Sequence, residues 1–200
     1  MDADLPGRVA RDKRALRAAV RVARSAKTPD DLAAAALALA GRVESLPAVR
    51  DAAVVAAYLS AGREPPTAVL LERWRARGLP VLLPVVLRDL DLDWAVDDGS
   101  RRPGVLRSVD EPAGPPLGRE AIARADVVVV PALAVDAAGH RLGQGGGSFD
   151  RALARARPDA LVVALLHDDE VPATPLPVEP HDRAVDVVVT PSRVLVVGPG

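Results

Sequence analysis

The sequence predicts an α/β fold, in which a mixed, mostly parallel central sheet is covered by helices on both faces of a single domain. Short valine-rich apolar runs alternate along the chain with segments of helical pattern, and this alternation is typical of buried strands joined by helices. The 200 residues suit one domain with a sizeable core. No long linker interrupts the alternation, so the whole chain, residues 1–200, is expected to be one domain.

Four segments have the pattern of helices. Residues 8–25 carry an apolar stripe surrounded by basic side chains, and residues 31–46 are rich in alanine and leucine. Residues 67–77 predict a third helix, because Gly78 suits the left-handed position that follows a helix. Residues 148–157 come directly after a glycine cluster and predict the last helix.

The predicted strands are short and apolar, and the run DVVVVP at 126–131 is the clearest of them. Pro84 has no N–H to donate, so the strand that contains it is expected at an edge or to end there. The Pro/Gly-rich stretch after the predicted strand at 90–96 is expected to be an ordered loop. The seven predicted strands are 52–59, 81–86, 90–96, 126–131, 161–166, 185–189 and 194–197.

Composition excludes several classes of function. A net charge of −1 provides no global field for nucleic acid or an anionic membrane, and the absence of cysteine excludes disulfides, thiolate catalysis and cysteine-type zinc sites. The three histidines, His140, His167 and His181, are too far apart for a helical zinc motif. Without a long apolar run or a signal-like N-terminus, the chain is expected to be cytoplasmic and soluble, and without an exposed apolar stripe, monomeric.

The segment from Asp136 to Arg151 is the most informative. It has four glycines between 143 and 147, where backbone amides can approach a ligand closely, and it joins a buried strand to a helix. Amides at a helix N-terminus favour an anion, and nucleotide phosphates are the obvious candidates. Arg141 would add a guanidinium contact, and Asp150 would hold Mg2+. The pattern is neither a Walker A loop nor a dinucleotide fingerprint, and a glycine-rich turn without a ligand is the alternative.

Within this segment, RLGQGGGSFDR at 141–151 resembles the RLGxGxGYYDR signature of the 5-formyltetrahydrofolate cyclo-ligases, also called methenyltetrahydrofolate synthetases. Further segments resemble the family's motifs in the same order and extend the resemblance over nearly the whole chain. They are KRALR at 13–17, YLSAGREPPT at 58–67, VLLPVV at 81–86, EP at 111–112, PALAVD at 131–136, and His181-Asp182 with Asp186 and Thr190.

The resemblance implies a fold and an activity. The fold is Rossmann-like, of the type shared with NagB, RpiA and CoA transferases. The activity is ATP- and Mg2+-dependent cyclisation of 5-formyltetrahydrofolate to 5,10-methenyltetrahydrofolate, through phosphorylation of the formyl oxygen and with release of ADP and phosphate. Such a transfer depends on positioning and charge neutralisation more than on a protein nucleophile.

The resemblance also implies roles for individual residues. Lys13 and Arg17 would contact the ATP phosphates, and Lys13 and Arg141 would be catalytic. Leu59 and Glu64 would bind the folate together with residues 145–149, and Asp150 and Asp182 would hold Mg2+. The residues implied in nucleotide binding are Lys13, Arg17, Arg141, Leu142, Gly143, Gln144, Gly145, Gly146, Gly147, Ser148 and Phe149.

The loss of an aromatic residue at Ser148 motivates an alternative function. Ser148 and Phe149 stand where the family has paired tyrosines, so two phenolic hydroxyls and one aromatic ring are missing. The alternative is a non-catalytic reduced-folate binding or regulatory protein derived from the family. A sugar-phosphate isomerase or CoA-transferase-like enzyme is a third hypothesis, on fold analogy alone.

Purely structural roles are the alternatives for several of these residues. Lys13 and Arg17 would then be solvated charges on a helix face. Glu64 would help to cap the helix that begins near Thr67. Asp136 would shape a turn. Trp74 and Trp94 are expected to pack in the core or on the surface rather than to bind a ligand.

Overall fold

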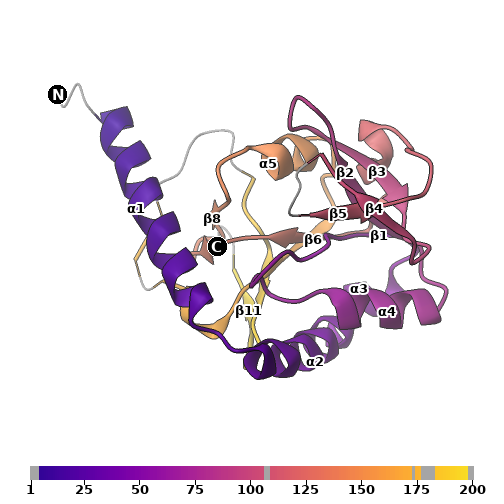
Figure 1. Ribbon diagram of the computed structural model, residues 1–200, viewed down its shortest axis with the longest axis horizontal. Helices are drawn as coiled ribbons and strands as arrows, with labels where there is room; N and C mark the ends of the chain where they lie inside the picture. Colours follow the sequence, from indigo (N-terminus) through magenta and orange to yellow (C-terminus); the bar gives the residue numbers. More distant parts are fainter. Residues whose placement is uncertain (1–4, 106–108, 173, 177–182, 198–200) are drawn as a thin grey trace.

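The computed structural model describes residues 5–105, 109–172, 174–176 and 183–197, with the backbone alone for residues 5–9. Its centre is a seven-stranded mixed sheet in the order β11-β10-β9-β6-β1-β2-β3 (Figure 1). The five inner strands are parallel, and the two edge strands run antiparallel to their neighbours. The strands are β1 (Val55–Ala56), β2 (Val81–Val86), β3 (Leu92–Val96), β6 (Val127–Pro131), β9 (Leu161–Leu165), β10 (Val187–Val189) and β11 (Val194–Val196).

Helices cover both faces of the sheet, as predicted. In Figure 1, α2 (Pro29–Ser45), α3 (Pro47–Asp51) and α4 (Ala68–Ala76) lie below the sheet, and α5 (Ser148–Leu153) lies above it. A short 3-10 helix, η1 (Arg119–Arg124), packs on the α5 side. Alternate residues of each strand serve the two faces, as the pleat requires: Val127 and Val129 pack toward α2–α4, and Val128 and Val130 pack toward α5.

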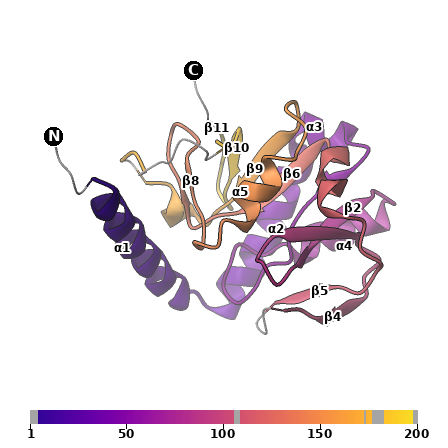
Figure 2. The ribbon, with the colours of Figure 1, turned by 90° about the horizontal axis from the view of Figure 1, so that it is seen from above.

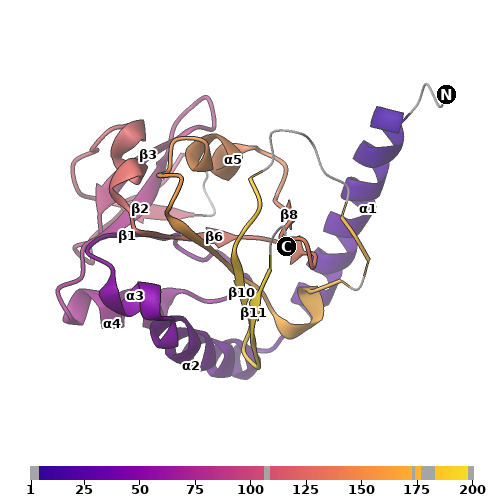
Figure 3. The ribbon, with the colours of Figure 1, turned by 180° about the vertical axis from the view of Figure 1, so that it is seen from behind.

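The first helix stands apart from this sandwich. Helix α1 (Leu5–Ser25) lies at one end of the molecule beside a small hairpin formed by β7 (Ala134–Val135) and β8 (Arg141–Leu142), as Figures 1 and 3 show from opposite sides. Leu16 and Val20 of α1 pack on Leu133, Ala134 and Leu142. Because β6 leads directly into this hairpin, α1 lies at the carboxyl ends of the parallel strands.

A second hairpin occupies the segment that was expected to be a loop. Strands β4 (Arg101–Pro103) and β5 (Asp110–Pro112) pair antiparallel and project from the sheet on the side away from α1 (Figure 2). Glu111 of β5 is buried, and its Oε1 accepts from the backbone N–H of Val86 (2.9 Å). This bond attaches the hairpin to the end of β2.

Several predicted elements are shorter or lie elsewhere in the sheet. The expected strand at 52–59 is only Val55–Ala56, and the expected helix at 148–157 ends at Leu153. An edge position for the strand that contains Pro84 is wrong, because β2 lies between β1 and β3. In the described chain β1 pairs only with Val81 and Leu82, so Pro84 has a ladder partner on the β3 side alone.

Other local predictions are confirmed. Gly78 follows α4 with φ +69°, and both tryptophans are fully buried in the core. A capping box begins α2: the Thr28 hydroxyl accepts from the N–H of Asp31 (3.2 Å), while the Asp31 carboxylate accepts from the N–H of Thr28 (2.8 Å). None of the described helices is both long and apolar enough to cross a membrane.

Candidate active site at the carboxyl edge of the sheet

The direction in which strands are added to the sheet reverses between β1 and β6. From β1 the chain adds β2 and β3 on one side of the sheet, and it then returns to add β6 and β9 on the other side. The loops that follow β1 and β6 therefore leave the sheet in opposite directions. In open α/β sheets, ligands bind outside the carboxyl ends of the strands at such a reversal.

The glycine loop lies at this edge. It begins after Leu142, the last residue of β8, and ends where α5 begins at Ser148. Gly145 and Gly147 have φ values of +106° and +68°, which L-residues rarely adopt, so the loop needs glycine at these two positions. Gly145 and Gly146 are exposed. The loop therefore has the conformation and the accessibility that an anion-binding backbone requires.

One basic side chain of helix α1, Arg17, contacts the glycine loop. The Nε of Arg17 donates to the carbonyl of Gly143 (2.9 Å), and the same guanidinium lies 3.5 Å from where a Cβ on Gly145 would be. Lys13, one helical turn earlier, is half-buried. The alternative of a freely solvated charge is therefore wrong for Arg17.

Gln144 joins this loop to the loop that follows β1. Its Oε1 accepts from Arg21 Nη2 (2.9 Å), and its Nε2 donates to Glu64 Oε1 (3.3 Å). The other oxygen of Glu64 accepts from the N–H of Ala61 (3.0 Å). Glu64 therefore closes its own loop and faces the glycine loop. The capping alternative is wrong, because no side chain caps the start of α4 at Thr67.

A cavity opens beside this bridge. Its volume is about 590 Å3, and it lies between the end of α1 and the loop 61–64. Three arginines, one carboxylate and one amide contribute to its wall: Arg21, Arg24, Arg63, Glu64 and Gln144. A volume of this size accommodates a drug-sized ligand, and the arginines of the wall provide donors to an anionic one.

Arg141 and Asp150 pair with each other. The Arg141 side chain is 4% exposed, and its Nη2 forms an ion pair with Oδ1 of Asp150, which is 31% exposed. Within the described part of the chain, no group of three or more histidine, cysteine or acidic residues gathers as a metal site. Asp182, the second expected metal ligand, lies outside the described residues.

Phe149 is tied to the core. Its half-buried ring packs edge to face with Trp94, with ring centroids 6.5 Å apart and planes 80° apart, and it contacts the cores on both faces of the sheet. Ser148, the first residue of α5, is also half-buried. Leu59 packs half-buried against the core on the α2–α4 side.

A buried ion pair attaches the end of α1 beneath this site. Arg24 donates to both carboxylate oxygens of Glu170, with Nε to Oε1 at 2.7 Å and Nη2 to Oε2 at 3.0 Å, and to the carbonyl of Ala132 (2.6 Å). His167 is 3% exposed, and burial lowers its pKa, so the neutral ring is favoured. The sequence pattern predicted that Arg24 lies on the polar surface of the first helix, and this is wrong, because Arg24 is only 5% exposed. No pattern in the sequence pointed to Glu170.

Asp136 shapes the turn between β7 and β8, as its structural alternative predicted. Its Oδ1 accepts from the N–H groups of Ala138 (3.0 Å) and His140 (2.9 Å), and its Oδ2 accepts from the N–H of Leu176 (2.8 Å). Burial opposes ionisation of this carboxyl, but the bonds from Leu176 and His140 outweigh burial and lower its pKa. Asp136 is therefore a charged structural residue behind the glycine loop.

Comparison with known proteins connects this geometry to a family. Residues 9–191 match the model of the 5-formyltetrahydrofolate cyclo-ligase family. The 5-formyltetrahydrofolate cyclo-ligase of Mycolicibacterium smegmatis is 44% identical over 151 residues, which are 71% of this chain and 75% of the relative. The Escherichia coli enzyme of the same name is 34% identical over 184 residues, 88% of this chain and 98% of the relative.

A solved structure agrees with this comparison. The NMR structure of 5,10-methenyltetrahydrofolate synthetase from Aquifex aeolicus superposes with a TM-score of 0.79 at 26% sequence identity. The match covers 94% of each chain, so the two proteins share the fold over nearly their whole length.

Proposed function

Because the chain belongs to the 5-formyltetrahydrofolate cyclo-ligase family and is therefore a ligase, we propose that it closes a ring on 5-formyltetrahydrofolate at the expense of ATP. The products are 5,10-methenyltetrahydrofolate, ADP and phosphate. The observation that carries the ATP requirement is the exposed glycine loop at the β1/β6 reversal, with Arg17 of α1 laid against it.

The chemistry suits a site without a protein nucleophile. The formyl oxygen is a poor leaving group, so the γ-phosphoryl group of ATP is first transferred to it. N10 then attacks the activated carbon and loses its proton, and phosphate departs with the former formyl oxygen. The loop amides and the cations Lys13, Arg17 and Arg141 neutralise charge on the transferring group, which is the main demand of phosphoryl transfer.

The residues present fit a Mg2+ ion carried by the nucleotide. Mg2+ in such sites takes one or two carboxylates together with substrate phosphates and water. Asp150 provides a partly exposed carboxylate beside the glycine loop, and Asp182 would add a second. When bound, Mg2+ would neutralise phosphate charge. The ion pair with Arg141 fixes the position of Asp150 at the start of α5, beside the loop to which the nucleotide is assigned.

The folate is assigned to the β1 side of the β1/β6 reversal. A pterin ring presents an amino group and a ring N–H, and a carboxylate such as Glu64 accepts from both. Glu64 already contacts Gln144 of the glycine loop at 3.3 Å, so this site adjoins the one assigned to ATP. Leu59 and Phe149 would provide apolar contacts, although the Phe149 ring is already in contact with Trp94.

The test is a spectroscopic assay of the purified protein. With 5-formyltetrahydrofolate, ATP and Mg2+ together, we expect the absorbance of the methenyl product to rise and one ADP to form per product. Omitting ATP or Mg2+ should abolish the rise. Asp150→Asn should raise the Mg2+ concentration needed for half-maximal rate. The control is Asp159→Asn, which removes an exposed carboxylate that pairs with Arg157. This change should leave the Mg2+ requirement as it is in the wild type.

Two outcomes would overturn the proposal. Saturable folate binding without ADP formation would establish the non-catalytic binder motivated by Ser148. Binding of a sugar phosphate with no nucleotide requirement would support the isomerase-like alternative instead.

A further inference from the structure

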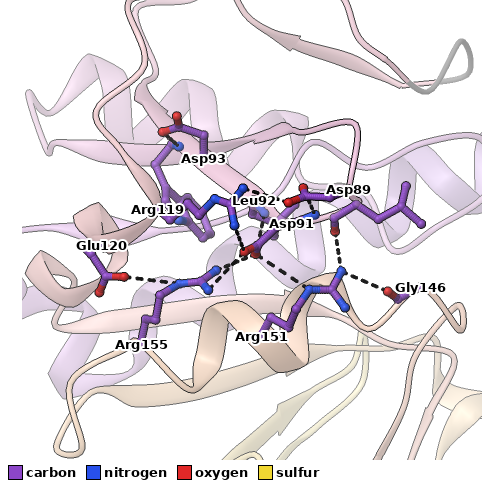
Figure 4. Close-up of polar contacts among 11 residues, drawn as sticks. Asp89, Asp91, Leu92, Asp93, Arg119, Glu120, Gly146, Arg151 and Arg155 are labelled. Atoms are coloured by element: carbon purple, nitrogen blue, oxygen red, sulfur yellow. Dashed lines mark hydrogen bonds and ion pairs between the residues drawn. The ribbon is translucent and has the colours of Figure 1, made fainter.

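The signature segment ends in Arg151, a residue to which the proposed function gives no role. Arg151 belongs to a polar cluster around Asp91, which lies just before β3 and is 4% exposed (Figure 4). The Asp91 carboxylate accepts from Arg155 (Nη2 to Oδ1, 2.6 Å) and from Arg119 (Nη1 to Oδ2, 2.9 Å). Burial raises the pKa of Asp91, but its arginine partners and the N–H of Leu92 outweigh burial, so the net shift is downward.

Arg151 has a different place in this cluster. Its Nε lies 3.9 Å from Asp91 Oδ1, farther than either of the other two guanidinium groups. Its short bonds go to backbone carbonyls, from Nη2 to Leu90 O at 2.7 Å and to Gly146 O at 3.2 Å. Arg155 and Arg119 therefore neutralise Asp91, while Arg151 connects two loops.

The first of these loops is a strained turn. Leu90 has φ +62°, the only positive value outside glycine in the described residues. A branched side chain in this region persists only where its surroundings fix it. The N–H of Leu90 donates to Leu87 O (2.9 Å), and the N–H of Leu87 donates to Asp91 O (2.9 Å). The turn therefore presents the Leu90 carbonyl to Arg151 from a fixed position.

The second loop is the glycine loop. A Cβ on Gly147 would lie 2.9 Å from Nη1 of Arg151, so the guanidinium lies directly against the end of the loop. In a trans peptide the C=O of one residue and the N–H of the next point in opposite directions. A Gly146 carbonyl held by Arg151 therefore directs the N–H of Gly147 away from Arg151.

We propose that Arg151 is a positioning residue, which the Leu87–Asp91 turn holds so that it orients the Gly146–Gly147 peptide with its N–H toward the nucleotide phosphates. Arg17 does the same for the preceding part of the loop, because it holds the Gly143 carbonyl at 2.9 Å. This inference rests on the proposed function, since it takes the loop to be the phosphate site.

The chain provides a matched control. Arg119 also contacts Asp91, and its side chain is 45% exposed, compared with 43% for Arg151. Arg119 donates to the carboxylates of Asp89 and Asp91 rather than to the glycine loop.

Arg151→Ala should raise the KM for ATP roughly ten-fold or more, because a charged hydrogen bond that orients the loop is lost. It should change the KM for the folate little. Arg119→Ala should leave both constants within about two-fold, and Arg151→Lys should recover part of the loss, since an ammonium group also donates to carbonyls.

Amide hydrogen exchange of the ligand-free proteins provides a readout that needs no activity. Residues 143–147 should exchange faster in Arg151→Ala than in the wild type or in Arg119→Ala. If the wild type turns over folate but the two alanine variants share the same KM for ATP and the same exchange, the positioning role is wrong and the proposed function stands. If the wild type shows no turnover, the proposed function fails, and equal exchange in the two variants would still refute the orientation of the loop by Arg151.

Discussion

Gly147 provides the sharpest test of backbone requirements in the glycine loop. Gly147 has φ +68°, and Gly78 after α4 has nearly the same value, φ +69°. Around Gly78, no described atom beyond the chain neighbours lies within 4 Å of the position that a Cβ would take. Alanine at either position should cost about 1 kcal/mol of unfolding free energy, because a Cβ disfavours the left-handed region. Only Gly147→Ala should also displace the Arg151 guanidinium and raise the KM for ATP.

Urea unfolding and initial rates at varied ATP concentration would measure the two effects. A loss of stability in both variants is expected, with a change of KM in Gly147→Ala alone. An unchanged KM in Gly147→Ala would mean that the end of the loop does not contact the nucleotide.

The sequence indicates the individual residues of the loop better than their partners. The glycine spacing and the basic residues at 13 and 17 can be recognised from the sequence alone, and Arg21 continues the same four-residue spacing. The partners of Arg24 and Gln144 are not visible, because Arg24 meets Glu170 across 146 positions and Gln144 meets Glu64 across 80. Such pairs follow from the order of the strands, which the local pattern does not contain.

Helix α1 brings Arg17 and Arg21 to the glycine loop, and the Arg24–Glu170 pair attaches the end of the helix. The side chains of this pair are 7% and 2% exposed. Glu170→Gln keeps an oxygen for the N–H of His167 but leaves the Arg24 charge buried without a counterion. We expect a loss of about 3 kcal/mol in unfolding free energy.

The control for this prediction is a surface pair at the same end of α1. Lys27 pairs with Asp169 at 3.0 Å, and these side chains are 21% and 49% exposed. Lys27→Ala should cost less than about 1 kcal/mol, because solvent screens the pair. Comparable losses in the two variants, measured by urea unfolding, would contradict the view that the buried pair anchors α1.

Secondary structure was predictable where the local pattern is strong. The helices α1, α2 and α4 and the strands β2, β6 and β9 agree with their predicted ranges to within a few residues. The β4–β5 hairpin was missed, because its strands are polar and hold Arg101 and Asp110 rather than alternating apolar residues. Its attachment comes from the Glu111 bond to Val86, a contact between distant segments.

At the scale of the whole molecule, the strand topology decides which loops meet at the candidate site. Alternating strands and helices predicted the α/β class, but the order that puts β1 between β6 and β2 depends on how the strands pair. That order brings the loops after β1 and β6, and with them Glu64 and the glycine loop, to one edge. The three segments that converge there are α1, the loop at 61–64 and the glycine loop. They lie more than 30 residues apart in the chain, so no single motif contains the site.

The central claim is that the glycine loop and the basic face of α1 bind ATP. Calorimetric titration of ATP with Mg2+ into the wild type, Arg17→Ala and Arg14→Ala tests it most directly, since Arg14 is an exposed arginine on the same helix. We predict saturable binding by the wild type and by Arg14→Ala, and binding roughly ten-fold weaker or more for Arg17→Ala. Absence of binding by the wild type, or equal affinity in the two variants, would contradict the account.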